Sequence, residues 1–223
     1  MEIDYIFKDK SLLKKALTHI SLANERGIES NQRLEFLGDS VLSFVIAGYI
    51  YKEFKNMDEG RLTEMRAAVV CEKALAKAAR MMDLGSGIAF GKSEQKCGGS
   101  DKDSILADAY ESVLAAIYLD GGIEPARVWV MNSLSGAIEE LKNMDFTNYK
   151  SEIQSYFQKR DKNREVVRYN LSGKTGPDHE PTFNVEATYL GRIIGRGEGK
   201  SRKAAEQEAA KIALSKVKHT QVV

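Results

Sequence analysis

The stretch NQRLEFLGDSVL, residues 31–42, carries the pattern from which the fold and the candidate site both follow. Its apolar residues recur every three or four positions, and the recurrence continues to Ile46, which predicts one long helix with an apolar face. Glu35 and Asp39 are four residues apart in this helix, so both carboxylates lie on one face, one turn apart. Because like charges at this spacing repel each other, we expect the pair either to reach solvent separately or to be held together by a cation.

A second predicted helix also carries two acids on one face: in SILADAYESVLAAIYLD, residues 104–120, Asp108 and Glu111 are three residues apart. Both acid pairs stand among apolar neighbours, so we expect them at the edge of a hydrophobic core. Four carboxylates meeting from two packed helices would form a hard-oxygen site for Mg²⁺ or Mn²⁺, with no soft ligand to select zinc. Such ions can hold a phosphodiester, activate a water and stabilise a leaving oxygen. The spacing alone also fits two solvated helix faces.

The rest of the N-terminal half is helical in pattern, apart from a glycine-rich loop expected at residues 85–103. The remaining helical stretches are 12–17, 62–82 and 125–143. The C-terminal part changes period after a helix at 149–160: residues 166–176, 182–191 and 192–199 alternate as strands do, and a last helix is expected at 200–217.

The sequence therefore predicts two domains, which suits a chain of 223 residues. We expect an all-α domain over residues 1–146, a linker at 147–149, a small α+β domain of order α-β-β-β-α over 150–218, and a tail at 219–223. Hydrophobic residues make up 43% of the chain and charged residues 29%, with only 3 Pro and 18 Gly, which excludes disordered and collagen-like classes.

Charge is divided between these parts. Residues 1–147 hold 18 Lys and Arg against 23 Asp and Glu, a net charge of −5, whereas residues 148–223 hold 15 against 9, a net charge of +6. The sum is the +1 of the whole chain. A basic segment of this kind is a hint of nucleic-acid contact.

Cys71 and Cys97 are far apart and belong to no paired motif, so we expect two reduced thiols and neither a disulfide framework nor a zinc site. No stretch approaches the ~18 consecutive apolar residues of a membrane span, and the acidic start MEIDYIFKDK lacks the layout of a signal peptide. The expected location is the cytoplasm, with no membrane partner.

The sequences of several segments resemble those of the ribonuclease III family. Residues 31–42 resemble its signature, and ALTHIS (16–21), DEGRLTEMRA (58–67) and SILADAYESVLAAIYLDGG (104–122) resemble its other blocks in the right order. The resemblance spans nearly the whole chain. It implies an all-helical, dimerising endonuclease domain followed by a double-stranded RNA-binding domain, with Glu35, Asp39, Asp108 and Glu111 as the catalytic acids that bind the metal.

Four further residues are interpreted, the first three with the help of this resemblance. Gln32 stands where the family usually has Glu, and we expect activity to be retained. Glu59 matches an acidic family position for RNA contact or site shape, although a helix N-terminal acid stabilised by the dipole explains it equally well. Phe36 resembles a residue that packs across the dimer interface, with ordinary core as the alternative. His19 is interpreted as structural, because a metal-activated water leaves no need for a second base.

Three elements of the basic part match a double-stranded RNA-binding domain. A polar stripe on its first helix, Ser151, Gln154 and Gln158, could hydrogen-bond to minor-groove 2′-hydroxyls. The loop residues Pro177, Asp178 and His179 resemble the loop that enters the next minor groove. At the start of the last helix, cations join the helix dipole in attracting phosphate, namely Lys200, Arg202 and Lys203.

Together these observations predict a homodimeric endoribonuclease that hydrolyses double-stranded RNA with Mg²⁺, for which Mn²⁺ can substitute. By resemblance, its products carry 5′-phosphates, 3′-hydroxyls and short 3′ overhangs, and its substrates are ribosomal RNA precursors and structured messenger RNAs. The alternative is a non-catalytic adaptor that binds double-stranded RNA. A helical di-metal oxidoreductase or diphosphate enzyme lacks support, because the chain has no Glu-x-x-His pair and no Asp-rich box.

Overall fold

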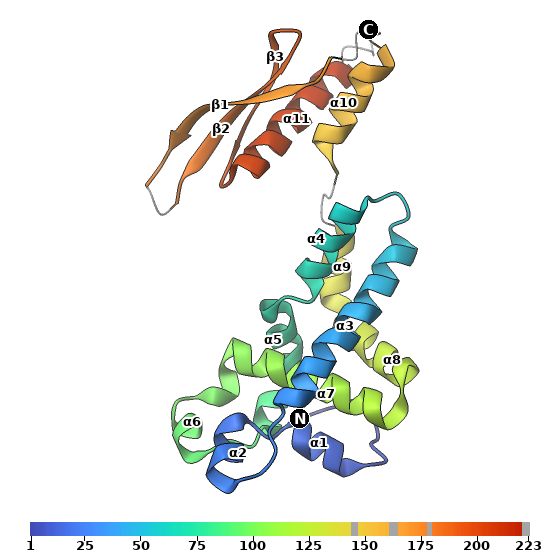
Figure 1. Ribbon diagram of the computed structural model, residues 1–223, viewed down its shortest axis with the longest axis vertical. Coiled ribbons are helices and arrows are strands. Elements are labelled where there is room, and N and C mark those ends of the chain that lie inside the picture. The colour runs from blue at the N-terminus through green and yellow to red at the C-terminus, as the bar shows by residue number, and fades with distance from the viewer. Residues whose placement is uncertain (144–146, 161–164, 178–179, 220–223) are drawn as a thin grey trace. The chain divides into compact units, whose positions relative to one another are not determined.

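The computed structural model describes residues 1–143, 147–160, 165–177 and 180–219. The chain divides into two compact units, Met1–Asp145 and Phe146–Val223, and each is described by itself (Figure 1). The order of elements matches the predicted fold class, an all-helical part followed by a small α+β part.

Over its described residues, 1–143, the first unit contains nine α-helices and two short 3₁₀ turns. The helices are α1 (Lys10–Ala16), α2 (Ile20–Arg26), α3 (Gln32–Glu53), α4 (Glu59–Val69), α5 (Glu72–Met81), α6 (Lys92–Lys96), α7 (Asp103–Gly121), α8 (Ile123–Ser133) and α9 (Ser135–Asn143); the turns are η1 (Leu84–Gly87) and η2 (Gly99–Asp101).

Helices α3 and α7 form the centre of this unit and cross each other (Figure 1). Most of α7 is buried, because apolar side chains occupy several of its faces, whereas α3 buries one face, from Leu34 to Ile50. By length and composition α3 could also cross a membrane, but here its buried face belongs to the core of the unit. Its other side exposes large apolar side chains, Phe36, Phe44 and Tyr51.

Two stretches that read as single helices are each broken in two. Residues 62–82 divide between α4 and α5, since Cys71 has the extended backbone of an N-cap, with φ −70° and ψ 151°. The β-branched pair Val69 and Val70 stands at the break, where such residues weaken a helix. Residues 125–143 divide between α8 and α9 at Leu134. The glycine-rich stretch 85–103 contains the short helix α6.

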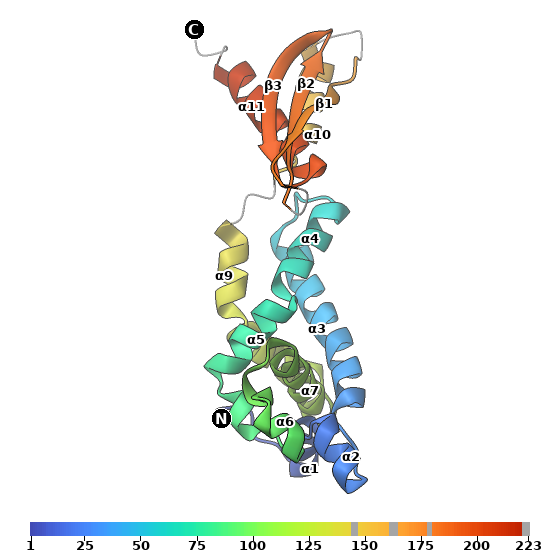
Figure 2. The ribbon, with the colours of Figure 1, turned by 90° about the vertical axis from the view of Figure 1, so that its left-hand side faces the viewer.

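The second unit contains α10 (Tyr149–Arg160), the strands β1 (Arg168–Thr175), β2 (Thr182–Tyr189) and β3 (Arg192–Gly199), and α11 (Arg202–His219). The strands pair antiparallel in the order β1-β2-β3. Leu190 and Gly191 join β2 to β3 with positive φ values of 50° and 74°, as a tight two-residue hairpin requires. Both helices cover the same face of the sheet (Figure 1 and Figure 2).

Small residues set the distance between β3 and α11. A Cβ atom on Gly197 would lie 2.2 Å from the Ala209 backbone nitrogen, and one on Gly195 would lie 2.2 Å from the Ala209 carbonyl oxygen. The facing side of α11 is made of buried alanines, which are Ala205, Ala209, Ala210 and Ala213. The helix therefore rests almost directly on the strand backbone, and this contact sets how closely α11 approaches β3.

Candidate functional site

The two acid pairs are brought together where α3 crosses α7. The crossing is close because Gly38 has no side chain: a Cβ atom there would lie 1.9 Å from the Glu111 carbonyl oxygen. Gly38 stands one residue before Asp39 and three after Glu35, so the point of contact lies inside the first acid pair. Glycine at this position thus lets the carboxylates of α3 and α7 share one site.

The electrostatics of the acids show that they act on one another. Glu35, Asp108 and Glu111 are half-buried, and Asp39 is exposed. Burial, followed by repulsion from the other three acids, raises the pKa of Glu111 to about 8. Burial and then Asp108 raise the pKa of Glu35. Among the described residues, the groups that shift the pKa of Glu35 and Glu111 are acids that raise it, so these carboxyls resist ionising together.

Two further groups, Glu72 and His19, act on the pKa of Asp108. Its pKa is raised by burial and then by Glu72, in the first turn of α5, while His19 opposes the shift. Sequence reasoning missed Glu72, because only the packing of α5 on α7 brings this acid near the site. His19 caps α2, where its Nδ1 accepts a hydrogen bond from the Ser21 backbone N–H at 3.2 Å. Its ring also packs against Phe90 at 5.3 Å, so the structure gives His19 a structural role.

The donor set suits a hard divalent cation, since it consists of carboxylate oxygens. Within the part of the chain that the structure describes, no three His, Cys, Asp or Glu side chains already converge at metal-binding distances. The acids therefore surround the site as separate, mutually repelling groups. A cation would offset the repulsion that raises the pKa of Glu111.

The accessory residues lie around α3 and α4. Gln32 is the exposed first residue of α3, where its backbone N–H donates to Ser30 Oγ at 3.4 Å. Glu59 is the exposed first residue of α4, where an acid is favoured by the helix dipole, and Asp58 caps this helix through the Arg61 N–H at 2.9 Å. Phe36 is 78% exposed, so the alternative that it belongs to the core of this unit is wrong.

In the second unit, the residues predicted to form a polar stripe on α10 differ in their surroundings. Ser151 and Gln158 are exposed, but Gln154 is half-buried and its amide is engaged. Gln154 Nε2 donates to the Glu165 carbonyl at 3.1 Å, and its Oε1 accepts from the Val167 N–H at 2.8 Å. Ser155, which sequence reasoning missed, is exposed one turn after Ser151. The exposed stripe thus consists of Ser151, Ser155 and Gln158.

The basic residues at the start of α11 are exposed and partly paired. Lys200 contacts Glu180 at 3.0 Å at the surface, whereas Arg202 contacts the largely buried Glu206 at 2.9 Å. An exposed ion pair such as Lys200–Glu180 contributes little energy, so a phosphate can compete for Lys200. Lys203 is exposed beside them, as is Pro177 in the loop before β2. Asp178 and His179 lie outside the described residues.

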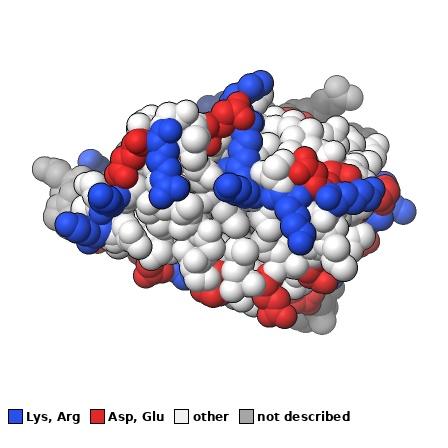
Figure 3. Space-filling model, turned by 90° about the horizontal axis from the view of Figure 1, so that it is seen from below, with Lys and Arg blue, Asp and Glu red and all other residues white. Residues whose placement is uncertain are grey.

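Another face of the molecule carries charges of both signs (Figure 3). Lys and Arg side chains are interspersed with Asp and Glu on the face drawn in Figure 3, with uncharged surface between them. Mixed charge of this kind produces only a weak field at a distance. The surface in this view therefore offers little attraction for a polyanion.

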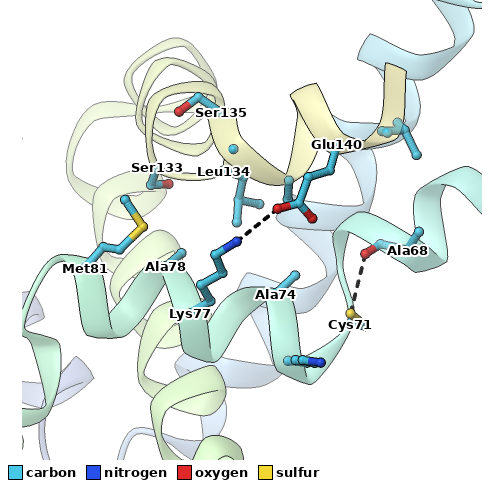
Figure 4. Close-up of a pocket in the computed structure, with 14 residues that line it drawn as sticks. Ala68, Cys71, Ala74, Lys77, Ala78, Met81, Ser133, Leu134, Ser135 and Glu140 are labelled. Carbon is cyan, nitrogen blue, oxygen red and sulfur yellow. Dashed lines mark hydrogen bonds and ion pairs between the residues drawn. The ribbon is translucent and has the colours of Figure 1, made fainter. Parts of the chain in front are cut away.

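A cavity of about 340 Å³ lies between α5 and α9, apart from the four acids (Figure 4). Lys77 and Glu140 form an ion pair across it at 3.0 Å. Cys71 Sγ, at one end, donates to the Ala68 carbonyl at 3.4 Å. Its walls are mostly apolar, including Ala78, Leu134 and the exposed Met81, so this cavity has none of the chemistry of the acid site.

Two family models match the chain, one for each unit. Residues 9–138 match "Ribonuclease-III-like", and residues 149–217 match "Double-stranded RNA binding motif". The first match covers the helices that carry the acids, and the second covers the sheet with α10 and most of α11.

Curated relatives are similar over nearly the full length. "Ribonuclease 3" of Caldanaerobacter subterraneus subsp. tengcongensis is 48% identical over 219 residues, covering 97% of this chain and 95% of the relative. "Ribonuclease 3" of Pelotomaculum thermopropionicum is 45% identical over 214 residues, covering 94% and 88%. Among solved structures, a nuclease domain from Campylobacter jejuni has 41% identity and a TM-score of 0.58, covering 61% of this chain and 94% of that domain.

Proposed function

This chain belongs to the ribonuclease III family, as an endonuclease followed by a double-stranded RNA-binding domain, and from that premise we propose how it works. We propose that it hydrolyses phosphodiester bonds of double-stranded RNA with Mg²⁺, for which Mn²⁺ can substitute. The observation that carries the proposal is that four acids lie around the crossing of α3 and α7, close enough for three of them to raise the pKa of Glu111.

Glu35, Asp39, Asp108 and Glu111 would hold the metal through their carboxylate oxygens. When bound, Mg²⁺ would offset the negative charge of the phosphate, lower the pKa of a water and stabilise the leaving oxygen. The acids of this chain would hold that charge in place, and the half-buried setting of Glu35, Asp108 and Glu111 limits screening by solvent. The family resemblance supports products with 5′-phosphate and 3′-hydroxyl ends and short 3′ overhangs.

The second unit would bring the duplex to this site. Its shape-based contacts would come from Ser151, Ser155 and Gln158 on α10, which can reach ribose hydroxyls, and its phosphate contacts from Lys200, Arg202 and Lys203. The residues from 148 onward carry the net charge of +6. Salt should therefore weaken duplex binding mainly through this part of the chain.

We further propose a homodimer formed along the exposed side of α3. Phe36, Phe44 and Tyr51 are 78%, 68% and 74% exposed there, which is unusual for large apolar side chains. A hollow of about 350 Å³ lies on the same side, lined by Leu37, Phe44, Tyr118 and Ile123 among others, and could receive an aromatic ring of a second copy. The solved Campylobacter jejuni structure is described as having a region involved in dimer formation.

By family resemblance, the substrates would be ribosomal RNA precursors and structured messenger RNAs in the cytoplasm. The alternative, an adaptor that binds duplexes without cleaving them, would keep the same second unit. The four acids that repel one another favour the enzyme, because an adaptor gains nothing from this costly arrangement.

The test is incubation of the protein with a long RNA duplex in Mg²⁺ and then in a chelator. We expect cleavage only with the metal. Asp39→Ala and Glu111→Ala should abolish cleavage while duplex binding, measured by fluorescence anisotropy, stays close to that of the parent. Glu139→Ala is the matched control, since Glu139 is an exposed acid on α9 that pairs with Lys142 at the surface. Absence of metal-dependent cleavage would favour the adaptor.

A further inference from the structure

Asn31 is a buried polar residue beside the acid site whose side chain has no protein partner. It is only 4% exposed, yet among the described residues its amide makes no hydrogen bond. Its backbone, in contrast, is fully engaged: the N–H donates to the Thr18 carbonyl at 2.9 Å, and its carbonyl accepts from Ser112 Oγ at 3.3 Å. The described residues do not satisfy this amide, so its hydrogen-bonding capacity is left for water or a ligand.

Asn31 lies next to acids of both helices. Its φ of −73° and ψ of −15° continue the turn of α3, so Asn31 lies on the same face as Glu35, one turn earlier. That face packs on α7, and Ser112, which contacts the Asn31 carbonyl, directly follows Glu111. Asn31 therefore stands at the inner edge of the acid site.

The amide is buried but can be reached from solvent. In the described part of the chain, the side-chain polar atoms that have neither solvent exposure nor a hydrogen-bond partner are Trp129 Nε1, Tyr169 OH and Gln207 Oε1. The amide atoms of Asn31 are not among them, so they keep some exposure to solvent. A group that enters the acid site from solvent can thus meet Asn31.

The chemistry of the site gives this amide a partner. Ionised carboxylates only accept hydrogen bonds, and so do the oxygens of a phosphodiester. Acids ionised to hold a metal therefore cannot donate a hydrogen bond to a phosphate, whereas the NH₂ of Asn31 is a neutral donor beside them. Hydrogen bonds to a charged group are roughly twice as strong as neutral ones.

We propose that the Asn31 side-chain amide donates a hydrogen bond to a phosphate oxygen of the RNA strand held at the four acids. This inference rests on the proposed cleavage of RNA and adds to it a neutral, substrate-contacting residue that positions the strand.

Two variants test it. Asn31→Ala removes the amide, and Asn31→Asp keeps the shape but removes the donor. For both we expect kcat/KM for a short duplex to fall about tenfold or more, the effect of losing one hydrogen bond to a charged group. The melting temperature of the metal-free Asn31→Ala protein should equal or exceed that of the parent, because no internal hydrogen bond is lost. Asn24→Ala, an exposed amide on α2, is the control and should change neither quantity.

Each outcome decides the matter. Parental kcat/KM in either Asn31 variant would overturn the inference, as would a loss of activity that only follows a lowered melting temperature. If the parent protein itself fails to cleave RNA in Mg²⁺, the proposed function fails instead. Parental cleavage in the Asn31 variants, together with inactive Asp39→Ala, would leave the function intact and remove only the role of Asn31.

Discussion

Gly38 in α3 touches the backbone of Glu111 in α7, with no room for a methyl group between them. Glycine is poor for helix stability, and an α-helix of this length gains from replacing it unless a close approach requires it. At Gly38 the approach brings two acid-bearing helices into contact. The geometry of the site therefore depends on an absent side chain.

Gly38→Ala should destabilise the protein by about 1–3 kcal/mol, because the added methyl group must push α3 away from α7. Cleavage of duplex RNA should fall as well, since the two acid pairs move apart. Gly48→Ala is the control in the same helix: nothing lies within 4 Å of its Cβ position, and we expect a gain of about 0.5–1 kcal/mol from helix propensity. Urea denaturation and cleavage rates measure both effects, and equal behaviour of the two variants would contradict the packing argument.

The metal-free protein should lose stability as the pH rises from 4.5 to 8. Folding raises the pKa of Glu111 from 4.5 to about 8, so between these values the folded state binds more protons than the unfolded state. Stability then falls with rising pH. Melting temperatures in chelator should show this decline, and Glu111→Gln should flatten it. An unchanged pH profile in that variant would mean that Glu111 is not the group responsible.

Gln154 and Gln158 should respond differently to replacement by alanine. Gln154→Ala removes two hydrogen bonds to the backbone at Glu165 and Val167, so we expect a loss of about 1–3 kcal/mol in the stability of the second unit. Gln158 is exposed, so Gln158→Ala should weaken duplex binding with little change in melting temperature. Calorimetry and anisotropy on the full chain distinguish the two effects, and the converse result would restore Gln154 to the RNA-binding stripe.

Gln32→Glu should change the cleavage rate less than tenfold. Gln32 is exposed at the start of α3, and the four acids are present without it. A charge added at the surface is screened by solvent and salt, so its effect on the site is small. Single-turnover rates at fixed Mg²⁺ measure the change. A gain of several hundredfold in the cleavage rate would contradict this expectation and show that Gln32 limits that rate.

The sequence predicted the long helices of the first part and the α-β-β-β-α order of the second because these depend on local periodicity, whereas the short helices α2 and α6 were not expected. The three- and four-residue recurrence of α3 and the alternation of β2 are strong patterns that packing does not override. The breaks at Cys71 and Leu134 were missed, since the residues on either side keep the helical period and only tertiary packing shows that the direction changes.

Individual site residues were predictable where spacing determines their face. Glu35 and Asp39 share a face of α3 as expected, but no local pattern reveals that Glu72 lies near Asp108, because α5 and α7 meet only in the fold. Gln154 shows the reverse case: a residue at the right spacing for the exposed stripe is turned to internal hydrogen bonds by the segment that precedes β1.

The contact of α11 with β3 has a consequence for experiments on this protein. Alanine scanning identifies important positions by removing atoms, but on this face of the helix the residues are already alanine, and the strand opposite is glycine at alternate positions, 195, 197 and 199. Alanine scanning therefore cannot detect the contact that holds α11 against β3. Only substitutions that add atoms, such as Gly197→Ala or Ala209→Val, would reveal how much of RNA recognition depends on it.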